Sequence, residues 1–179
     1  GSGKSYVAKN FGYPVFNADF EVSKLYKKNK KIYKKLNKKL PEYISSFPIK
    51  KNEITKAILS NKVNLKKIII IVHLEIRKAL KKFLKNNKHK KAVILDIPLL
   101  LENKINKKKD ILVFVDSKKS DIERKIKKRT NFNRKLFNKF KKIQYSPKYK
   151  KKRSHFVIKN NFTKKSVKTG INYILNKIS

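Results

Sequence analysis

The sequence lacks cysteine, methionine and tryptophan altogether, and it contains only 4 glycines and 5 prolines. The absence of cysteine excludes disulfide bonds and thiolate metal sites, and it agrees with a reducing compartment. The longest apolar run, Ile68 to Val72, is far too short to cross a bilayer, and the first residues lack the pattern of a secretory signal. We therefore expect a soluble, cytoplasmic protein that has no membrane partner.

Acidic residues are also scarce, since 11 of them stand against 51 lysines and arginines and leave a net charge of +40. Such an excess taken alone is typical of proteins that bind nucleic acid or another polyanion. The lysines, however, are scattered through every segment, together with many asparagines, isoleucines and aromatic residues. This distribution predicts a solvated lysine coat and no specific nucleic-acid partner.

The first five residues, Gly1-Ser2-Gly3-Lys4-Ser5, match the closing half of the phosphate-loop motif G-x-x-x-x-G-K-[ST]. In that motif backbone N–H groups surround the phosphates, the lysine reaches the β- and γ-phosphates, and the hydroxyl binds Mg²⁺. The opening glycine and the strand that leads into the loop would precede residue 1. We therefore expect the natural N-terminus to lie upstream; a glycine-serine terminus without function is the alternative.

Four short apolar runs, separated by stretches of helical periodicity, predict a parallel α/β sheet. The runs are Tyr13–Phe16, Ala92–Asp96, Ile111–Val115 and Phe156–Ile158. Ligands of such sheets gather at the carboxyl ends of the strands, so Asp19, which follows the first run, is expected beside the phosphate loop. The alternative role of Asp19 is a helix N-cap.

Two helical regions carry basic residues at informative positions. Within residues 20–91, where we expect helices over 22–40, 53–59 and 63–84, His73 and Arg77 are four apart and share one helix face. They would grip an anionic substrate together, or belong to a solvated face. Residues 121–153 are charged and helical in period, and they predict either a lid with arginines for phosphoryl transfer or a plain solvated helix pair.

Six segments, taken in their order and spacing, resemble the dephospho-CoA kinases, a family of small P-loop kinases. The segments are Gly1–Ser5, Asn17-Ala18-Asp19, His73–Arg77, Asp96–Glu102, the region of Gln144, and Phe156–Asn160. The resemblance implies an α/β P-loop kinase whose parallel sheet lacks its first, central strand in this chain. It also implies a kinase core at 1–19 and 92–179, a helical lid at about 121–153 and a helical acceptor-binding insertion at 20–91.

The implied reaction is ATP-dependent phosphorylation of the 3′-hydroxyl of dephospho-CoA, which gives coenzyme A with Mg²⁺ as the metal. The implied catalytic residues are Lys4, Asp19 and Arg129, and Ser5 is the implied metal ligand. The implied nucleotide-binding residues are Gly1, Ser2, Gly3, Lys4, Ser5, Tyr6 and Asn160. The implied acceptor-binding residues are His73, Arg77, Asp96, Pro98, Leu99 and Glu102.

The chain departs from the family pattern at five places. Asn17 replaces an acidic residue, Leu74 replaces a proline, and Tyr6 stands where threonine is usual; Ile143 and the pair Ser154-His155 differ as well. Three other interpretations therefore stay open: a different small-molecule P-loop kinase, a basic nucleic-acid-binding module, and an inactive truncated relative.

Overall fold

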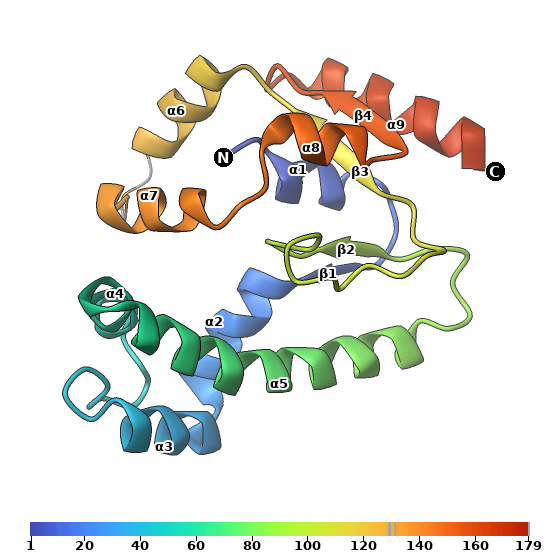
Figure 1. Cartoon of the computed structure of the whole chain (residues 1–179). Coiled ribbons are helices and arrows are strands. Elements are labelled where there is room, and N and C mark those ends of the chain that lie inside the picture. Colours follow the sequence, from blue (N-terminus) through green and yellow to red (C-terminus); the bar gives the residue numbers. More distant parts are fainter. Residues whose placement is uncertain (129, 131, 179) are drawn as a thin grey trace. The chain divides into compact units, whose positions relative to one another are not determined.

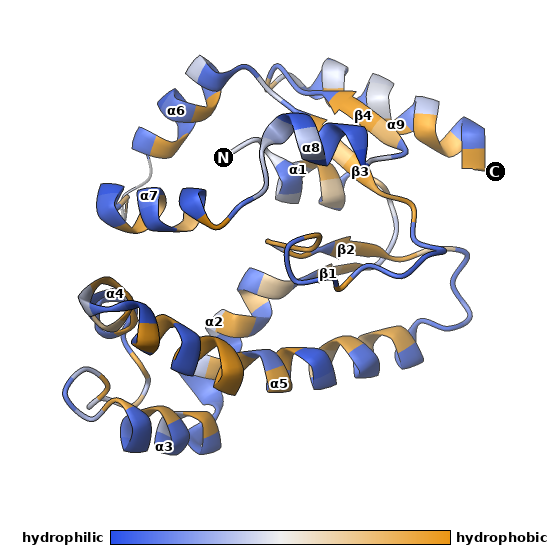
Figure 2. Cartoon of the chain, in the orientation of Figure 1, coloured by the Kyte–Doolittle hydropathy of each residue, from blue (hydrophilic) through white to orange (hydrophobic). Residues whose placement is uncertain are grey.

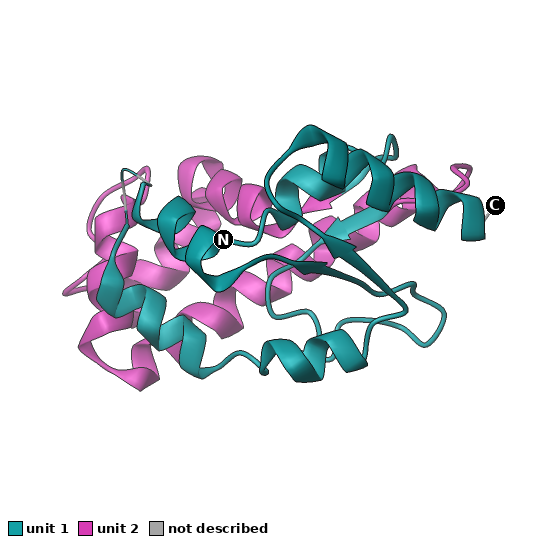
Figure 3. Cartoon of the chain, turned by 90° about the horizontal axis from the view of Figure 1, so that it is seen from above, with its two compact units in different colours: residues 1–15, 94–179 teal, residues 16–93 magenta. Residues whose placement is uncertain are grey.

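The computed structural model describes residues 1–128, 130 and 132–178 (Figure 1). The chain forms two compact units, shown in different colours in Figure 3, and each is described by itself. Unit 1 contains residues 1–15 and 94–179, and unit 2 contains residues 16–93. The functional division into core, lid and acceptor-binding insertion remains a prediction.

Unit 1 is an α/β assembly, as the sequence predicts. Strands β3 (Val113–Asp116) and β4 (Phe156–Lys159) pair in parallel, with Val113 opposite Phe156 and Asp116 opposite Lys159. Strand β2 (Ile94–Asp96) belongs to a separate two-stranded sheet with β1 (Val15–Asn17), and the Ile94 N–H donates to the Pro14 carbonyl at 2.8 Å. Its helices are α1 (Lys4–Lys9), α6 (Lys119–Lys127), α7 (Arg134–Lys142), α8 (Pro147–Lys152) and α9 (Lys164–Ile178).

The core of unit 1 lies where α1 and α9 meet β3 and β4. Its buried members are apolar residues from these four elements and from the turn after α1: Val7, Phe11, Val115, Ile158, Val167, Ile171 and Ile174. The three residues from α9 recur at intervals of four and three, so they form one stripe of that helix. Figure 2 shows the apolar strands β3 and β4 beside this helix.

Unit 2 is a group of four helices arranged around the longest one, α5 (Lys62–Asn86). Helices α2 (Ala18–Lys28), α3 (Lys30–Lys39) and α4 (Lys51–Ser60) each pack against α5. Its buried side chains include Ile32, Leu36, Ile44, Ala57, Ile68 and Val72. Lysines alternate with these apolar residues along the helices, which gives each helix one buried and one solvated side (Figure 2).

The expectation of one helix over 22–40 is wrong, because Asn29 separates two helices, α2 and α3. This residue ends α2, and its Oδ1 accepts a hydrogen bond from the Ile32 N–H at 3.0 Å, so it also caps α3. An asparagine side chain competes well for the unpaired N–H groups at a helix start.

No helix among residues 1–128, 130 and 132–178 has the length and apolar composition needed to cross a membrane.

Candidate active site

The loop Gly1–Gly3 leads directly into α1, as its motif requires. Gly3 has φ 86° and ψ 14°, a left-handed conformation that glycine adopts without steric cost. The first hydrogen bond of the helix runs from the Val7 N–H to the Gly3 carbonyl at 3.0 Å. The N–H groups that begin a helix have no partner within it, which makes them available to a phosphate.

The Ser2 carbonyl of this loop accepts two hydrogen bonds from side chains at the ends of β3 and β4. Asn160 Nδ2 donates to it at 2.9 Å, and the Ser117 hydroxyl donates to it at 3.1 Å. Asn160 is only 3% exposed, and its Oδ1 accepts from the Phe162 N–H at 2.9 Å. The structure thus places Asn160 against the phosphate loop, whereas Ser117 was not among the residues expected from the sequence.

A cleft of about 500 Å³ lies between α1 and α9. Tyr6 lines it with 45% of its surface exposed, so this aromatic ring stands next to the loop in contact with solvent. The other lining residues are Asn10, Lys164, Lys165, Lys168, Ile171 and Asn172. A cationic cleft of this kind attracts anions.

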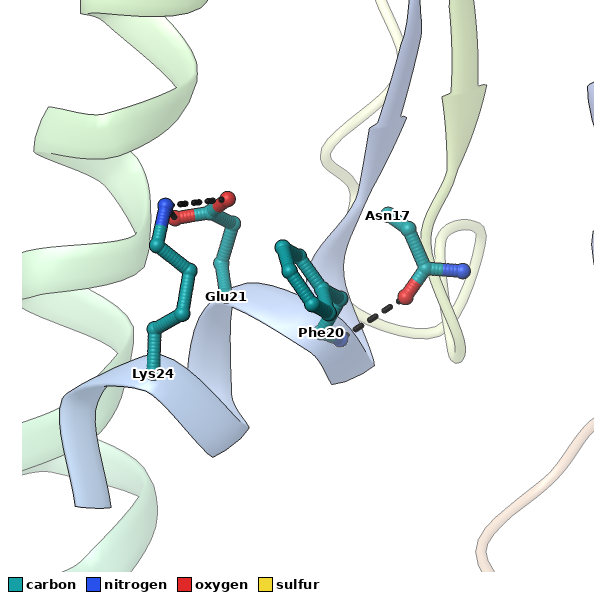
Figure 4. Close-up of polar contacts among 4 residues, drawn as sticks. All are labelled: Asn17, Phe20, Glu21 and Lys24. Atoms are coloured by element: carbon teal, nitrogen blue, oxygen red, sulfur yellow. Dashed lines mark hydrogen bonds and ion pairs between the residues drawn. The ribbon is translucent and has the colours of Figure 1, made fainter. Parts of the chain in front are cut away.

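In unit 2, Asp19 is an exposed residue in the first turn of α2. The N-cap of this helix is Asn17, whose Oδ1 accepts from the Phe20 N–H at 2.8 Å (Figure 4). The alternative interpretation of Asp19 as the N-cap is therefore wrong. One turn further, Glu21 pairs with Lys24 at 3.2 Å, also drawn in Figure 4.

His73 and Arg77 both lie on α5, one turn apart. Partial burial of the imidazole, followed by the positive charge of Arg77, lowers the pKa of His73 below its usual value. His73 is therefore neutral at pH 7 and presents a hydrogen-bonding ring, while the exposed Arg77 presents the positive charge.

The segment from Asp96 to Glu102 begins at the last residue of β2. Asp96 is 7% exposed at the end of the strand, and Pro98 and Leu99 lie half-buried in the turn after it. Glu102 Oε1 accepts from Lys150 Nζ at 2.8 Å and from the Tyr145 N–H at 2.9 Å. These contacts tie the segment to α8.

Burial raises the pKa of the Glu102 carboxyl, but the hydrogen bond from Lys150 and further hydrogen bonds from backbone N–H groups lower it, and the net pKa lies below the usual value. Glu102 is therefore ionised at neutral pH. Lys150 was not expected from the sequence, since 48 residues separate it from its partner and the lysine-rich helix around it gives no distinguishing pattern.

Arg129 lies outside the described residues, so the expected lid arginine stays a prediction. The neighbouring Arg124 pairs with Asp121 at 2.6 Å on α6. Lys151 of α8 pairs with Asp116 at 2.9 Å, at the end of β3. Within residues 1–128, 130 and 132–178, no group of three histidines, aspartates or glutamates is arranged to hold a metal ion.

Comparison with known proteins supports the family resemblance seen in the sequence. The dephospho-CoA kinase family model matches residues 1–166 of this chain. The chain belongs to the dephospho-CoA kinase family. The resemblance inferred from six motif segments is thereby confirmed, and this family is one of ATP-dependent transferases.

The alignments with individual relatives extend over almost the whole of this chain. A dephospho-CoA kinase of Wolbachia sp. subsp. Brugia malayi (strain TRS) is 30% identical over 184 residues, which cover 100% of this chain and 94% of the relative. The crystal structure of TT1252 from Thermus thermophilus matches with a TM-score of 0.77 and 23% identity, covering 99% of this chain and 93% of that chain.

A dephospho-CoA kinase structure from Campylobacter jejuni matches with a TM-score of 0.63 and 20% identity, covering 100% of this chain and 93% of that chain. At these identities the two structures support the fold alone. The α/β P-loop kinase class expected from the sequence is confirmed.

Proposed function

We propose that this protein transfers the γ-phosphoryl group of ATP to the 3′-hydroxyl of dephospho-CoA, giving coenzyme A and ADP. The observation that carries the proposal is the family match over residues 1–166, whose first five residues are the phosphate loop at the start of α1. The same loop suits any ATP-dependent kinase, so the family match supports this particular acceptor.

The residues of the loop would hold the nucleotide. Backbone N–H groups of Gly1 to Ser5 surround the β-phosphate, and Lys4 neutralises charge on the β- and γ-phosphates. Tyr6 would contact the nucleotide next to the loop; the support is its exposed side chain in the cationic cleft between α1 and α9. Because phosphoryl transfer proceeds with little covalent help from the protein, positioning and charge neutralisation supply most of the rate.

The donor set fits Mg²⁺, since the Ser5 hydroxyl is a hard oxygen ligand. This ion keeps several waters and is commonly held by one or two protein oxygens together with substrate phosphates, so a protein-built cage is not required. When bound, Mg²⁺ neutralises charge on the β- and γ-phosphate oxygens.

Asp19 would accept the proton of the 3′-hydroxyl. As the ribose oxygen forms its bond to the γ-phosphorus, the bond to the bridging oxygen breaks, ADP leaves, and the proton passes to the carboxylate. A carboxylate suits this task because the attacking alcohol is weakly acidic. The support for Asp19 is its exposed place in the first turn of α2, two residues after the capping residue Asn17.

The acceptor would bind through His73 and Arg77, with Arg77 facing its phosphates and the neutral His73 accepting or donating a hydrogen bond. Asp96, Pro98, Leu99 and Glu102 would also contact the acceptor, and Arg129 would neutralise charge from the lid. We also propose that the protein acts in the cytoplasm, and the absence of cysteine from the sequence is compatible with that location.

The deciding experiment compares acceptors under one set of conditions. Dephospho-CoA, 3′-deoxy-dephospho-CoA, AMP and CMP are each incubated with ATP and Mg²⁺, and products are identified by mass spectrometry. We expect rapid phosphorylation of dephospho-CoA alone, and loss of activity in Lys4→Ala. Equal phosphorylation of AMP or CMP, or phosphorylation of the 3′-deoxy compound, contradicts the proposal.

A further inference from the structure

Asn160 makes three hydrogen bonds that join β3, β4 and the phosphate loop. Its backbone N–H donates to the Asp116 carbonyl at 2.7 Å, which continues the pairing of β4 with β3. Its side chain, 3% exposed, donates to the Ser2 carbonyl and accepts from the Phe162 N–H, each at 2.9 Å. Both ends of the amide are therefore used inside the protein.

The Ser2 carbonyl sits in a planar peptide unit with the Gly3 N–H. In a trans peptide the C=O and N–H point in opposite directions. Two donors, Asn160 Nδ2 at 2.9 Å and the Ser117 hydroxyl at 3.1 Å, hold this carbonyl. The Gly3 N–H therefore points away from Asn160 and Ser117.

Gly3 itself is shaped by the same contact. A Cβ atom at Gly3 would collide with Asn160 Nδ2, and its φ of +86° is one that residues with side chains rarely adopt. The asparagine amide thus occupies the space next to the glycine, and the two residues together fix the backbone there.

We propose that Asn160, with Ser117, is a positioning residue that sets the orientation of the Ser2–Gly3 peptide and so presents the Gly3 N–H to the phosphates of ATP. This rests on the proposed ATP-dependent reaction, and it assigns Asn160 a role in orienting the loop rather than in contacting the nucleotide directly. Charged groups near this point are Lys125, 5.4 Å from the Phe162 ring centroid, and the Asp116–Lys151 pair.

The substitution Asn160→Asp tests the contact with Ser2 selectively. One carboxylate oxygen still accepts from the Phe162 N–H, but the other faces the Ser2 carbonyl as a second acceptor. Asn161→Asp is the matched control, because it makes the same change of charge at an exposed neighbour whose Oδ1 accepts from Thr163 and would still do so. ATP and dephospho-CoA affinities are measured by calorimetry, and folding by thermal melts.

We expect the Kd for ATP of Asn160→Asp to exceed that of Asn161→Asp about 10-fold at about pH 8, because the hydrogen bond to the Ser2 carbonyl is lost and the carboxylate repels that carbonyl. The ratio should shrink at about pH 6, because a buried aspartate protonates readily and its O–H then donates to Ser2. The Kd for dephospho-CoA should be the same in both variants.

Ser117 gives an independent test if Asn160→Asp does not fold. Ser117→Ala should weaken ATP binding about threefold, and Ser117→Thr, which keeps the hydroxyl, should restore it. ATP affinities within about twofold of the controls overturn the proposal, as does a parallel loss for both substrates together with a lower melting temperature. Since ATP binding is read directly, absence of dephospho-CoA phosphorylation in the unsubstituted protein would reject the proposed function without deciding this point.

Discussion

Asp19 is the residue at which chemistry can be separated from binding. Asp19 is exposed, and asparagine has nearly the same shape, so the substitution removes the charge at almost constant volume. We expect Asp19→Asn to lower kcat at least ~100-fold, the usual scale for losing a positioned base, while the Kd for ATP stays within about twofold. Steady-state kinetics and calorimetry measure the two quantities. Glu21→Gln, two residues further along the same helix, is the control, and near-normal turnover of Asp19→Asn would refute the assignment.

Glu53 is a buried carboxylate that organises the chain between α3 and α4. It is 9% exposed, and its oxygens accept hydrogen bonds from the N–H and hydroxyl groups of Ser45 and Ser46 and from the Lys50 N–H, at 2.6–3.1 Å. Burial raises the pKa of Glu53, but the Ser46 hydroxyl and the three backbone N–H groups outweigh it and lower the pKa to about 2.

This lowered pKa predicts how stability depends on pH. The unfolded carboxyl titrates near 4.5, so the stabilisation is complete above that pH and is lost as pH falls toward about 2. We expect Glu53→Gln to reduce the free energy of unfolding by on the order of 2 kcal/mol at pH 7, allowing for solvent screening, and to flatten its dependence between these pH values. Urea titrations across this range provide the measurement, with the exposed Glu42→Gln as control; parallel pH profiles for all three proteins would exclude the effect.

At the scale of elements, the contact of Glu102 with Lys150 and Tyr145 links the turn after β2 to α8. The pair is sheltered, with side-chain exposures of 10% for Glu102 and 22% for Lys150. Ion pairs of this kind contribute more than fully exposed ones, because water screens them less.

A double-mutant cycle of Glu102→Gln and Lys150→Ala should give a coupling free energy on the order of 1 kcal/mol in urea unfolding at pH 7. The pair Asp121–Arg124, in which the arginine side chain is 67% exposed, serves as the comparison and should give a coupling near zero. Because the pKa of Glu102 is lowered, its coupling should also fade as pH drops through the acidic range. Additive effects of the two substitutions would show that the contact contributes nothing.

The elements that could be read from the sequence are those with a strong local pattern. The apolar run before Asp96 and the glycines of the loop were identified because strand burial and phosphate binding each impose a residue type at a fixed spacing. The break at Asn29 was missed because both halves share one lysine-rich amphipathic pattern and neither glycine nor proline marks the junction.

The candidate site, too, could be predicted from the sequence only where a local motif marks it. Its residue types follow from motifs, but the contacts that place them join distant positions: 115 residues separate Ser117 from Ser2, and 158 separate Asn160 from Ser2. Such pairs arise from the parallel pairing of β3 with β4, which brings both strand ends to the loop. A local pattern carries no information on them.

For the whole molecule, the dominant property is a charge of +40. Lysines occur in every helix of both units, and the cleft between α1 and α9 collects three of them. Because 51 basic residues face only 11 acidic ones, the excess cannot be neutralised within the chain. A surface of this kind attracts any polyanion at low salt, whatever its sequence.

The lysine coat therefore predicts a specific behaviour toward DNA. If binding comes from counterion release alone, affinity for duplex DNA should be independent of base sequence and should fall steeply with salt, by about 10³-fold or more between about 50 and 200 mM if six or more phosphates are contacted. Fluorescence anisotropy with two unrelated duplexes of equal length measures both properties, and a charge-matched polyanion such as heparin is the control competitor. Tight binding that persists at about 0.3 M salt, or a clear preference for one duplex, would instead indicate a dedicated nucleic-acid surface.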